Sequence, residues 1–478
     1  MTLRFLAAAL VLMGVGAAAA APHHHAAFRE SAGTWLGAWG YPATPLAPGK
    51  PDPDTTPPNP PPVVPASLLP VTDAAPAHVE VVPTNQTPEL KNVTLRQIVR
   101  VSVAGSRLRL RLSNEAGTDP LAIGTVHVAE AGEDGAIVPG TDHIVTFDDG
   151  QISFTIPQAA PYYSDPIPMK VKALQLLAVS VYVPGPVARN FHSTWNYVSD
   201  FGNRSSETAL TGVKLIRSAA YVTGVDVMPD TARAVVVTLG DSITEGAASS
   251  INAFKGWPDR LAERLAADKA GRAWSVVNAG IGANRLLHTM LGPDVPARLD
   301  RDVFAVPGVK KIILLEGIND IGRPFQGGFE FEGPLTVEQL IAVDRQVIVR
   351  AHERGIKVIG ATLTPYEGAH YYDPKGEAMR SALNRWIRTG GAFDAVIDFD
   401  AVVKDPAHPT AIRPGFNKYD HLHPNDAGYK AMADAIDLRL ITNNISGTET
   451  HNDTSAHRAH RSAHRHTAAR RGHRTATR

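Results

Sequence analysis

Alternating apolar and polar residues dominate the first half of the chain. Leu108, Leu110 and Leu112 stand between arginines, and the preceding run from Leu95 to Val101 is also strand-like. Such alternation is typical of strands with one buried face, and the Ala104-Gly105-Ser106 segment between the two runs predicts a β-hairpin. Further strand-like runs follow, with few helical patterns among them: Ile123–Val128, Ile152–Ile156 and Leu174–Val183. We therefore predict an all-β sandwich or jelly-roll-like domain over residues 21–230.

Arg107, Arg109 and Arg111 occupy the polar positions of this alternation. A row of cations on one strand face could bind a ligand. Antiparallel sheets, however, commonly expose one polar face to water. We favour a solvated face for the three arginines.

After Val235 the pattern of apolar and polar residues changes, and apolar runs alternate with helical patterns. Helices are expected over Pro258–Ala267, from Thr336 with a capping box to Gln339, and from near Pro424 to the end of the last amphipathic run. The apolar runs predict five strands: Val235–Gly240, Trp274–Asn278, Lys311–Leu315, Ile356–Leu363 and Ala395–Phe399. Strand–helix alternation indicates an α/β domain with a parallel sheet, which we place at residues 231–445.

Composition and charge restrict the possible functions of the protein more than they restrict its fold. The 478 residues carry no formal net charge, so nothing in the overall balance attracts nucleic acid, and they include no cysteine. Residues 1–20 combine a basic start, an apolar middle and small residues at the end, which predicts a signal peptide and a secreted or periplasmic protein. No other segment is apolar and long enough to form a transmembrane segment. Residues 42–70 are crowded with proline and predict a linker or a long loop.

The last residues of the chain, 446–478, have a different composition again. They contain seven arginines and six histidines and almost nothing apolar. A segment with so little to bury is expected to be disordered. Its charge could attract an anionic polymer, although an inert solvated tail is the simpler interpretation.

Four short blocks of small and polar residues follow predicted strands in the α/β half. Ligands and catalytic groups collect at the carboxyl ends of parallel strands, so we expect the blocks to lie together. In chain order they are Gly240-Asp241-Ser242, then Asn278-Ala279-Gly280-Ile281-Gly282-Ala283-Asn284-Arg285, then Gly317-Ile318-Asn319-Asp320, and finally Asp420-His421-Leu422-His423-Pro424. The serine hydroxyl of the first block is a candidate nucleophile that needs a base.

These four blocks, in this order, resemble those of the SGNH hydrolases, also called GDSL esterases and lipases. The resemblance covers roughly residues 234–441, and the preceding β domain resembles accessory domains of some exported bacterial members. It implies a flavodoxin-like three-layer fold and ester hydrolysis without metal or cofactor. The Gly-x-Ser-x-Gly turn of the α/β-hydrolases is absent, since Thr244 stands where its second glycine belongs.

The resemblance also implies roles for particular residues. Ser242 is the expected nucleophile, His423 the base that takes its proton, and Asp420 the carboxylate that orients His423. The oxyanion donors are expected to be the Ser242 N–H, the Ala283 N–H and the Asn319 side chain. Ala283 stands where the family usually has glycine, so a backbone that needs positive φ would strain it, and Gly282 could donate instead.

Two alternatives remain at the last block. Asp405-Pro406-Ala407-His408-Pro409 repeats its spacing fifteen residues earlier, but only Pro424 is followed by an amphipathic run, with the proline suited to the first helical position. We therefore assign the base to His423 and not His408. A zinc site built from Asp420, His421 and His423 is the other alternative, and no further ligand cluster supports it.

The sequence thus predicts an exported serine ester hydrolase. Its substrate would be a small-molecule or polysaccharide-linked ester, with deacetylation of a carbohydrate favoured on architecture. A lipase or lysophospholipase acting on lipid esters is the alternative. A third possibility is an envelope polysaccharide-binding protein in which the hydrolase half is incidental.

Overall fold

The computed structural model describes residues 34–42, 44–45, 80–81, 90–186, 190–218, 221–290, 292–325 and 335–443. All of them belong to one compact unit that begins at Thr34. The predicted signal peptide at 1–20 and the tail at 446–478 lie outside the described residues, as does most of the proline-rich segment 42–70.

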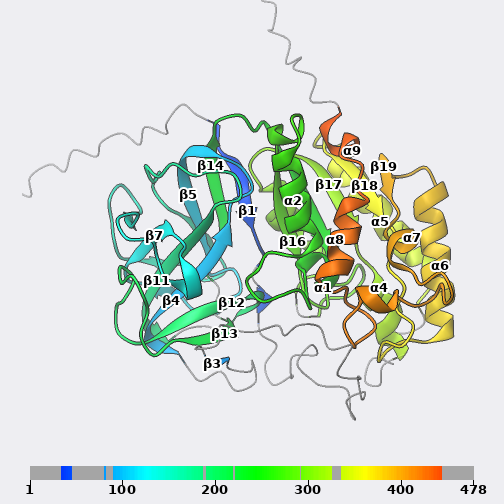
Figure 1. Ribbon diagram of the computed structural model, residues 1–478, viewed down its shortest axis with the longest axis horizontal. Coiled ribbons are helices and arrows are strands. Elements are labelled where there is room, and N and C mark those ends of the chain that lie inside the picture. The colour runs from blue at the N-terminus through cyan, green and yellow to red at the C-terminus, as the bar shows by residue number, and fades with distance from the viewer. Residues whose placement is uncertain are drawn as a thin grey trace, which may run out of the picture. The chain divides into compact units, whose positions relative to one another are not determined.

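A five-stranded parallel sheet forms the centre of the second half of the chain (Figure 1). Its strands lie in the order β16-β15-β17-β18-β19, the flavodoxin-like arrangement in which the first strand sits between the second and third. The bounds are β15 (Ala234–Gly240), β16 (Trp274–Gly280), β17 (Val309–Leu315), β18 (Lys357–Ala361) and β19 (Ala395–Ile397). The predicted α/β class is confirmed.

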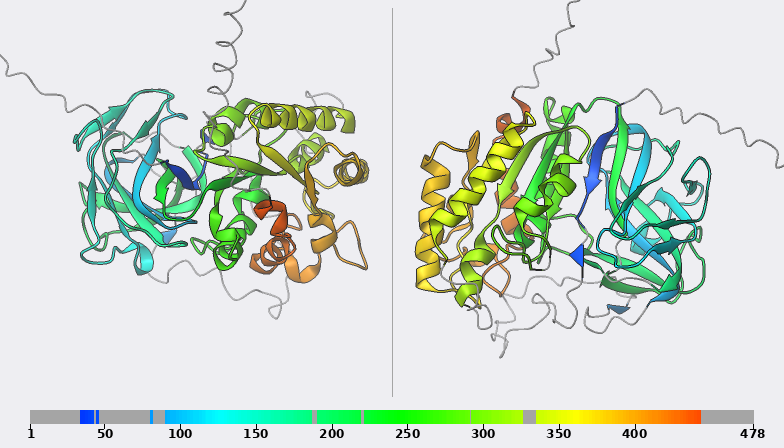
Figure 2. Two further views of the ribbon diagram at one scale, coloured as in Figure 1. Left: turned by 90° about the horizontal axis from the view of Figure 1, so that it is seen from above. Right: turned by 180° about the vertical axis from the view of Figure 1, so that it is seen from behind.

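Helices cover both faces of this sheet, with α2 (Trp257–Ala267) and α8 (Asp426–Asp434) on one side and α5 (Val337–His352) on the other (Figure 2). Thr336 and Gln339 form the predicted capping box of α5. Helix α6 (Pro374–Thr389) was not among the predicted helices, although Asp373 caps it and Pro374 opens it. Short helices complete the set: α1 (Ser242–Glu245), α3 (Val295–Leu299), α4 (Ile318–Gly322), α7 (Phe399–Val403) and α9 (Arg439–Thr442).

Two larger sheets, antiparallel except for one pair, make up the first half, as predicted for a preceding β region. One has the order β1-β14-β5-β10, and the other the order β3-β13-β12-β4-β11-β7-β8. The first contains β1 (Leu36–Gly40), β5 (Gly105–Ser113), β10 (Pro161–Tyr163) and β14 (Val222–Pro229). The second contains β3 (Glu80–Val81), β4 (Lys91–Arg100), β7 (Val126–Glu130), β8 (His143–Val145), β11 (Leu176–Pro186), β12 (Asn190–Phe201) and β13 (Lys214–Ser218). β2 (Thr44–Pro45) pairs with β12, and β6 (Leu121–Ile123) pairs with β9 (Phe154–Ile156).

The predicted hairpin of β4 and β5 is wrong, because these strands lie in different sheets. β4 pairs with β11 and β12, whereas β5 pairs with β14 and β10. The alternation itself was interpreted correctly, since Leu108, Leu110 and Leu112 are all fully buried. Period two reports which face of a strand is buried, but it does not report the strand's partner.

Strand β1 and the edge strand β16 join the two halves. The Ser102 hydroxyl lies 2.7 Å from that of Ser275 in β16, and Ser275 donates to the Gly37 carbonyl at 2.6 Å. Arg100 forms an ion pair of 2.8 Å with Glu263 in α2. These residues, Ser102, Ser275 and Gly37, are all buried. The contact between the two halves of the chain therefore includes hydrogen-bonded polar groups as well as apolar packing.

No helix among the described ranges is long and apolar enough to cross a membrane.

Candidate active site

The first block turns sharply at the carboxyl end of β15. All seven residues of this strand are buried, as expected for a strand covered on both faces. A Cβ at Gly240 would collide with the carbonyl oxygen of Leu315, so only glycine fits there. Asp241 accepts a hydrogen bond of 2.8 Å from the Ile243 N–H and thereby caps α1. Ser242 is the first residue of α1 and is 4% exposed.

A continuous series of side chains joins Ser242 to the fourth block. Ser242 Oγ lies 2.8 Å from His423 Nε2, and His423 Nδ1 lies 2.7 Å from Asp420 Oδ2. The other oxygen of Asp420 accepts the N–H groups of Leu422 and His423, each at 3.0 Å. The carboxylate therefore holds both the imidazole ring and the backbone that carries it.

The charge of His423, together with hydrogen bonds, keeps Asp420 ionised. Burial alone would raise its pKa, but the charge of His423 and the hydrogen bonds from the His423 side chain and two backbone N–H groups outweigh burial and lower the pKa to about 2. An ionised carboxylate beside Nδ1 stabilises the imidazolium that forms when the other ring nitrogen accepts a proton.

The two Asp-x-x-His-Pro segments take different positions. Asp405 accepts the Ala407 N–H within its own loop, and the His408 side chain is exposed. It is His423 that reaches Ser242. One detail of the prediction is wrong, because α8 begins at Asp426 with Asn425 as its cap, so Pro424 precedes the cap instead of opening the helix. The Asn425 side chain accepts two of the free N–H groups of the helix, a task that proline cannot perform.

The second and third blocks meet at the carboxyl ends of β16 and β17, the strands on either side of β15. Asn319 Nδ2 donates to the Asn284 carbonyl at 3.1 Å, and its Oδ1 accepts from the Tyr371 hydroxyl at 3.3 Å. Asp320 accepts the N–H groups of Leu286 and Leu287 at 2.8 and 3.0 Å, which fixes the loop after β16 against α4. Burial raises the pKa of Asp320 to about 6.

Ala283 has a φ of 55°, in the left-handed region that favours glycine. The backbone strain expected of a non-glycine residue at positive φ therefore falls on Ala283 itself. No described residue accepts a hydrogen bond from the N–H of Ser242, Gly282 or Ala283. All three amides are thus available to an oxyanion, and the geometry leaves Gly282 and Ala283 as equal candidates.

A buried cluster of charged residues packs against the first and second blocks. Its central residue, Arg298, was not predicted from the sequence. Arg298, 1% exposed, donates to the Gly240 and Ala279 carbonyls at 3.0 and 2.7 Å and to Asn284 Oδ1 at 2.9 Å. It thereby ties the first block to the second. No local pattern marks Arg298, because its partners come from distant strand ends.

Two carboxylates of this cluster have raised pKa values. Burial, and secondarily the neighbouring charge of Asp241, raise the pKa of Glu316. Burial likewise raises the pKa of Asp241 to about 7, against the opposing effects of the Ile243 N–H, His423 and Arg298. Arg298 itself pairs with Asp302 at 3.3 Å, so its charge is compensated within the cluster.

A parallel sheet with a Ser–His–Asp series at its carboxyl edge defines a serine hydrolase type of site. Residues 238–431 match the model of the GDSL-like Lipase/Acylhydrolase family. This region of the chain is a GDSL-like lipase/acylhydrolase domain. No curated protein matches the chain closely enough to count as a relative.

Several solved structures share similarity with this part of the chain. One is an alpha/beta hydrolase enzyme from the metagenome of Lake Arreo, with 22% identity over 44% of this chain and 96% of that chain, at a TM-score of 0.35. Another is an acetylxylan esterase from Geobacillus stearothermophilus, with 22% identity over 44% of this chain and 95% of that chain, at a TM-score of 0.34.

Proposed function

We propose that this GDSL-like domain hydrolyses carboxylic esters through an acyl-serine intermediate. The observation that carries the proposal is the series from Asp420 Oδ2 to His423 Nδ1 at 2.7 Å and from His423 Nε2 to Ser242 Oγ at 2.8 Å. A serine hydroxyl is a weak nucleophile until a base removes its proton, and His423 is within hydrogen-bond reach to do so.

In the first half of the reaction, His423 Nε2 accepts the Ser242 proton as Oγ bonds to the ester carbonyl carbon. The carbonyl oxygen becomes an oxyanion, while Asp420 stabilises the imidazolium. The intermediate collapses with cleavage of the bond to the alcohol oxygen, which leaves with the proton from His423. The acyl group remains on Ser242.

In the second half, His423 removes a proton from water, and the hydroxide oxygen attacks the acyl carbon. Cleavage of the bond to Oγ releases the acid, and Ser242 recovers its proton. The oxyanion of both halves accepts from the Ser242 N–H, the Gly282 or Ala283 N–H and the free N–H of Asn319. Asn319 is positioned for this because Asn284 and Tyr371 hold its amide group.

We further propose that the acyl group is small, that the alcohol belongs to a carbohydrate, and that the protein works after export, secreted or in the periplasm. The support is the joining of the hydrolase domain to a large β-strand region and the signal-like composition of residues 1–20. Fractionation of cells and N-terminal sequencing of the mature protein test the export.

Turnover of p-nitrophenyl acetate, butyrate and longer esters tests the chemistry. We expect the acetate to be cleaved fastest, and Ser242→Ala to abolish turnover without changing the melting temperature. The matched control is Ser249→Ala, which removes a nearby hydroxyl bonded to the Gly246 carbonyl. Faster cleavage of long-chain esters would favour a lipid substrate. Full turnover by Ser242→Ala would reject the mechanism.

A further inference from the structure

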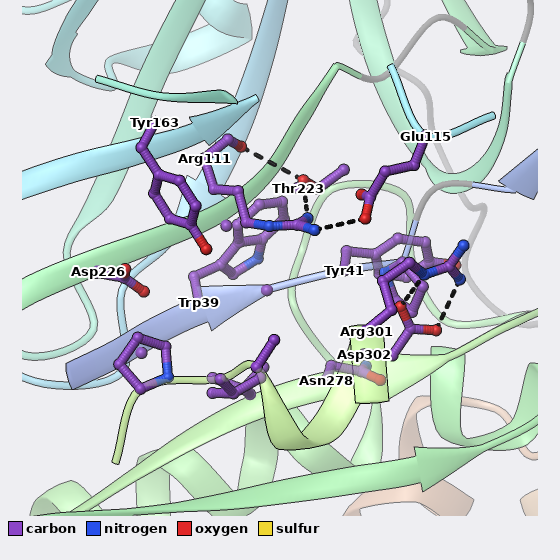
Figure 3. Close-up of a pocket in the computed structure, with 18 residues that line it drawn as sticks. Trp39, Tyr41, Arg111, Glu115, Tyr163, Thr223, Asp226, Asn278, Arg301 and Asp302 are labelled. Atoms are coloured by element: carbon purple, nitrogen blue, oxygen red, sulfur yellow. Dashed lines mark hydrogen bonds and ion pairs between the residues drawn. The ribbon is translucent and has the colours of Figure 1, made fainter. Parts of the chain in front are cut away.

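A cavity lies away from Ser242, where the β-strand region faces the edge of the parallel sheet (Figure 3). Counted together with the open, solvent-filled space at its mouth, it has a volume of about 520 Å³. Trp39, Arg111 and Tyr163 line it from the β-strand region, and Arg301 and Asp302 line it from the segment before β17. Neither Ser242 nor His423 is among its lining residues.

The aromatic wall of the cavity is held in place. Tyr163 is 38% exposed, yet the guanidinium carbon of Arg109 lies 4.8 Å from the centre of its ring. Arg109 is itself fixed, since it lies 4.8 Å from the Trp35 ring and forms an ion pair of 2.9 Å with Asp226. The Tyr163 ring is therefore supported on one face by a packed side chain and still reachable by a ligand.

Every charged side chain that lines the cavity has an oppositely charged partner. Arg111 donates to Glu115 at 2.7 Å, and Arg301 forms two hydrogen bonds with Asp302 at 2.5 and 2.9 Å. Asp226 is paired with Arg109. An ionic ligand would have to compete with these pairs, and breaking a buried pair is costly. The expectation of a solvated face is thus incomplete, because Arg109 and Arg111 lie in this partly buried network.

A neutral ligand with several hydroxyl groups suits such a lining. Each hydroxyl can donate to a carboxylate oxygen and accept from a guanidinium N–H, so the ion pairs need not open. Arg111 uses one terminal nitrogen on Thr223 and the other on Glu115, which leaves further N–H groups for a ligand. The C–H faces of a sugar ring can pack against the Trp39 and Tyr163 rings.

We propose that this cavity binds a neutral saccharide, a site separate from the catalytic serine. The binding does not depend on ester hydrolysis, so either proposal can fail without the other. In a polysaccharide-linked substrate, such a site would hold the chain while Ser242 acts on its ester groups.

Isothermal titration of the full chain carrying Ser242→Ala, with xylohexaose and cellohexaose as probes, tests the proposal. We expect at least one of these neutral oligosaccharides to bind. Adding Tyr163→Ala should raise the Kd about tenfold, which corresponds to about 1.4 kcal/mol. Tyr163→Phe keeps the ring and should retain binding. Phe201→Ala is the matched control, because Phe201 is an aromatic side chain 77% exposed on β12.

Esterase turnover in the wild-type background separates the two proposals. Tyr163→Ala should leave cleavage of p-nitrophenyl acetate unchanged, because the residue touches no part of the Ser242 site. Should Tyr163→Ala fail to fold, intrinsic fluorescence replaces it: bound saccharide should alter the emission, and Trp39→Phe should remove that change. The proposal is overturned if neither oligosaccharide binds, if Tyr163→Ala and Trp39→Phe leave binding and signal intact, or if trigalacturonate binds more tightly than both neutral probes.

Discussion

Arg298 donates a hydrogen bond of 3.0 Å to the carbonyl oxygen of Gly240, the last residue of the strand that leads into Ser242. The same guanidinium bonds Ala279 and Asn284 after β16. One buried cation therefore ties the turn that carries Ser242 to the loop that carries Gly282 and Ala283. A lysine would keep the charge but lose the planar fork that reaches these acceptors together.

We expect Arg298→Lys to lower kcat by about 10- to 100-fold, because small misplacements of reacting groups can cost that much. KM should change little, since ground-state binding does not require the oxyanion geometry. Steady-state kinetics with p-nitrophenyl acetate, well below the melting temperature, would measure this. Arg301→Lys is the matched control, because Arg301 shares the partner Asp302 but does not contact Gly240. An equal loss in both variants would contradict a positioning role.

His423→Ala should lower kcat by several orders of magnitude, and His408→Ala should change it by less than about tenfold, or roughly 1.4 kcal/mol of barrier. His423 reaches Ser242 Oγ, whereas His408 is exposed on another loop. Kinetics of the two variants at one pH suffice. The opposite result would move both the base and its orienting carboxylate to the earlier segment.

The same series predicts the acid limb of the pH profile. Because the pKa of Asp420 is lowered to about 2, this carboxylate stays ionised throughout an assay between about pH 4 and 8. A fall of kcat on acidification in that range would therefore report a group other than Asp420: the base His423, or the buried Asp241 and Asp320, whose pKa values burial raises to about 7 and 6. A flat profile from about pH 5 to 8, where histidines ordinarily titrate, would argue against His423 as the base.

Asn319→Ala should lower kcat by about 10²–10³, the usual cost of losing one oxyanion donor. Tyr371→Phe should lower it by less than about tenfold, since it removes only the hydroxyl that orients Asn319 at 3.3 Å. Tyr366→Phe is the control, because Tyr366 is equally buried and its ring centre lies 6.0 Å from that of Tyr371. A loss in Tyr366→Phe as large as in Tyr371→Phe would mean that packing, not orientation, is at work.

Asp344 lies on the core-facing side of α5, and its Oδ1 has no hydrogen-bond partner among the described residues. Burial, with a smaller effect of Asp320, raises its pKa well above the ordinary value. A raised carboxyl pKa means that the folded state holds a proton that the unfolded state has lost. The contribution of Asp344 to stability is therefore greatest at low pH and declines as pH rises above the ordinary aspartate pKa.

Asp344→Asn should consequently stabilise the protein more at pH 8 than at pH 5, because the amide is neutral at both pH values and takes up no proton on folding. Urea unfolding at the two pH values measures the difference. Glu353→Gln, at the exposed end of the same helix, should have no such effect. A gain independent of pH would show that proton uptake by Asp344 on folding is not the source of the instability.

Deleting residues 448–478 should leave turnover of p-nitrophenyl acetate unchanged and should weaken retention on a heparin column. The segment contributes seven arginines and one aspartate from residue 451 onward. Retention should fall as the salt concentration rises, because at physiological ionic strength charges interact only over about 8–10 Å. Replacing the seven arginines with lysine should preserve it. Loss of folding or turnover on deletion would show the tail to be structural.

The sequence was sufficient to predict the α/β class and the place of the four blocks, because parallel strands end at one edge of their sheet. Ser242 could be selected as a candidate because it follows a buried apolar strand, and the resemblance of the four blocks gave His423 its predicted role. The choice between His423 and His408 also followed from the amphipathic run after Pro424. The unpredicted α6 has a sequence signal in Asp373, which caps it, and Pro374, which opens it.

Contacts between distant segments were decided only by the tertiary structure. The alternation around Leu110 revealed a buried face but not that β5 pairs with β14 instead of β4, because side-chain period is the same for every partner. Arg298 and Tyr371 carry no motif, and they matter only because folding brings them to Gly240 and Asn319. The surroundings of Arg109 and Arg111, the paired arginines near Tyr163, were likewise decided only by the tertiary structure. Their polarity pattern fits a solvated strand, and only the apposition of the two halves of the chain encloses them.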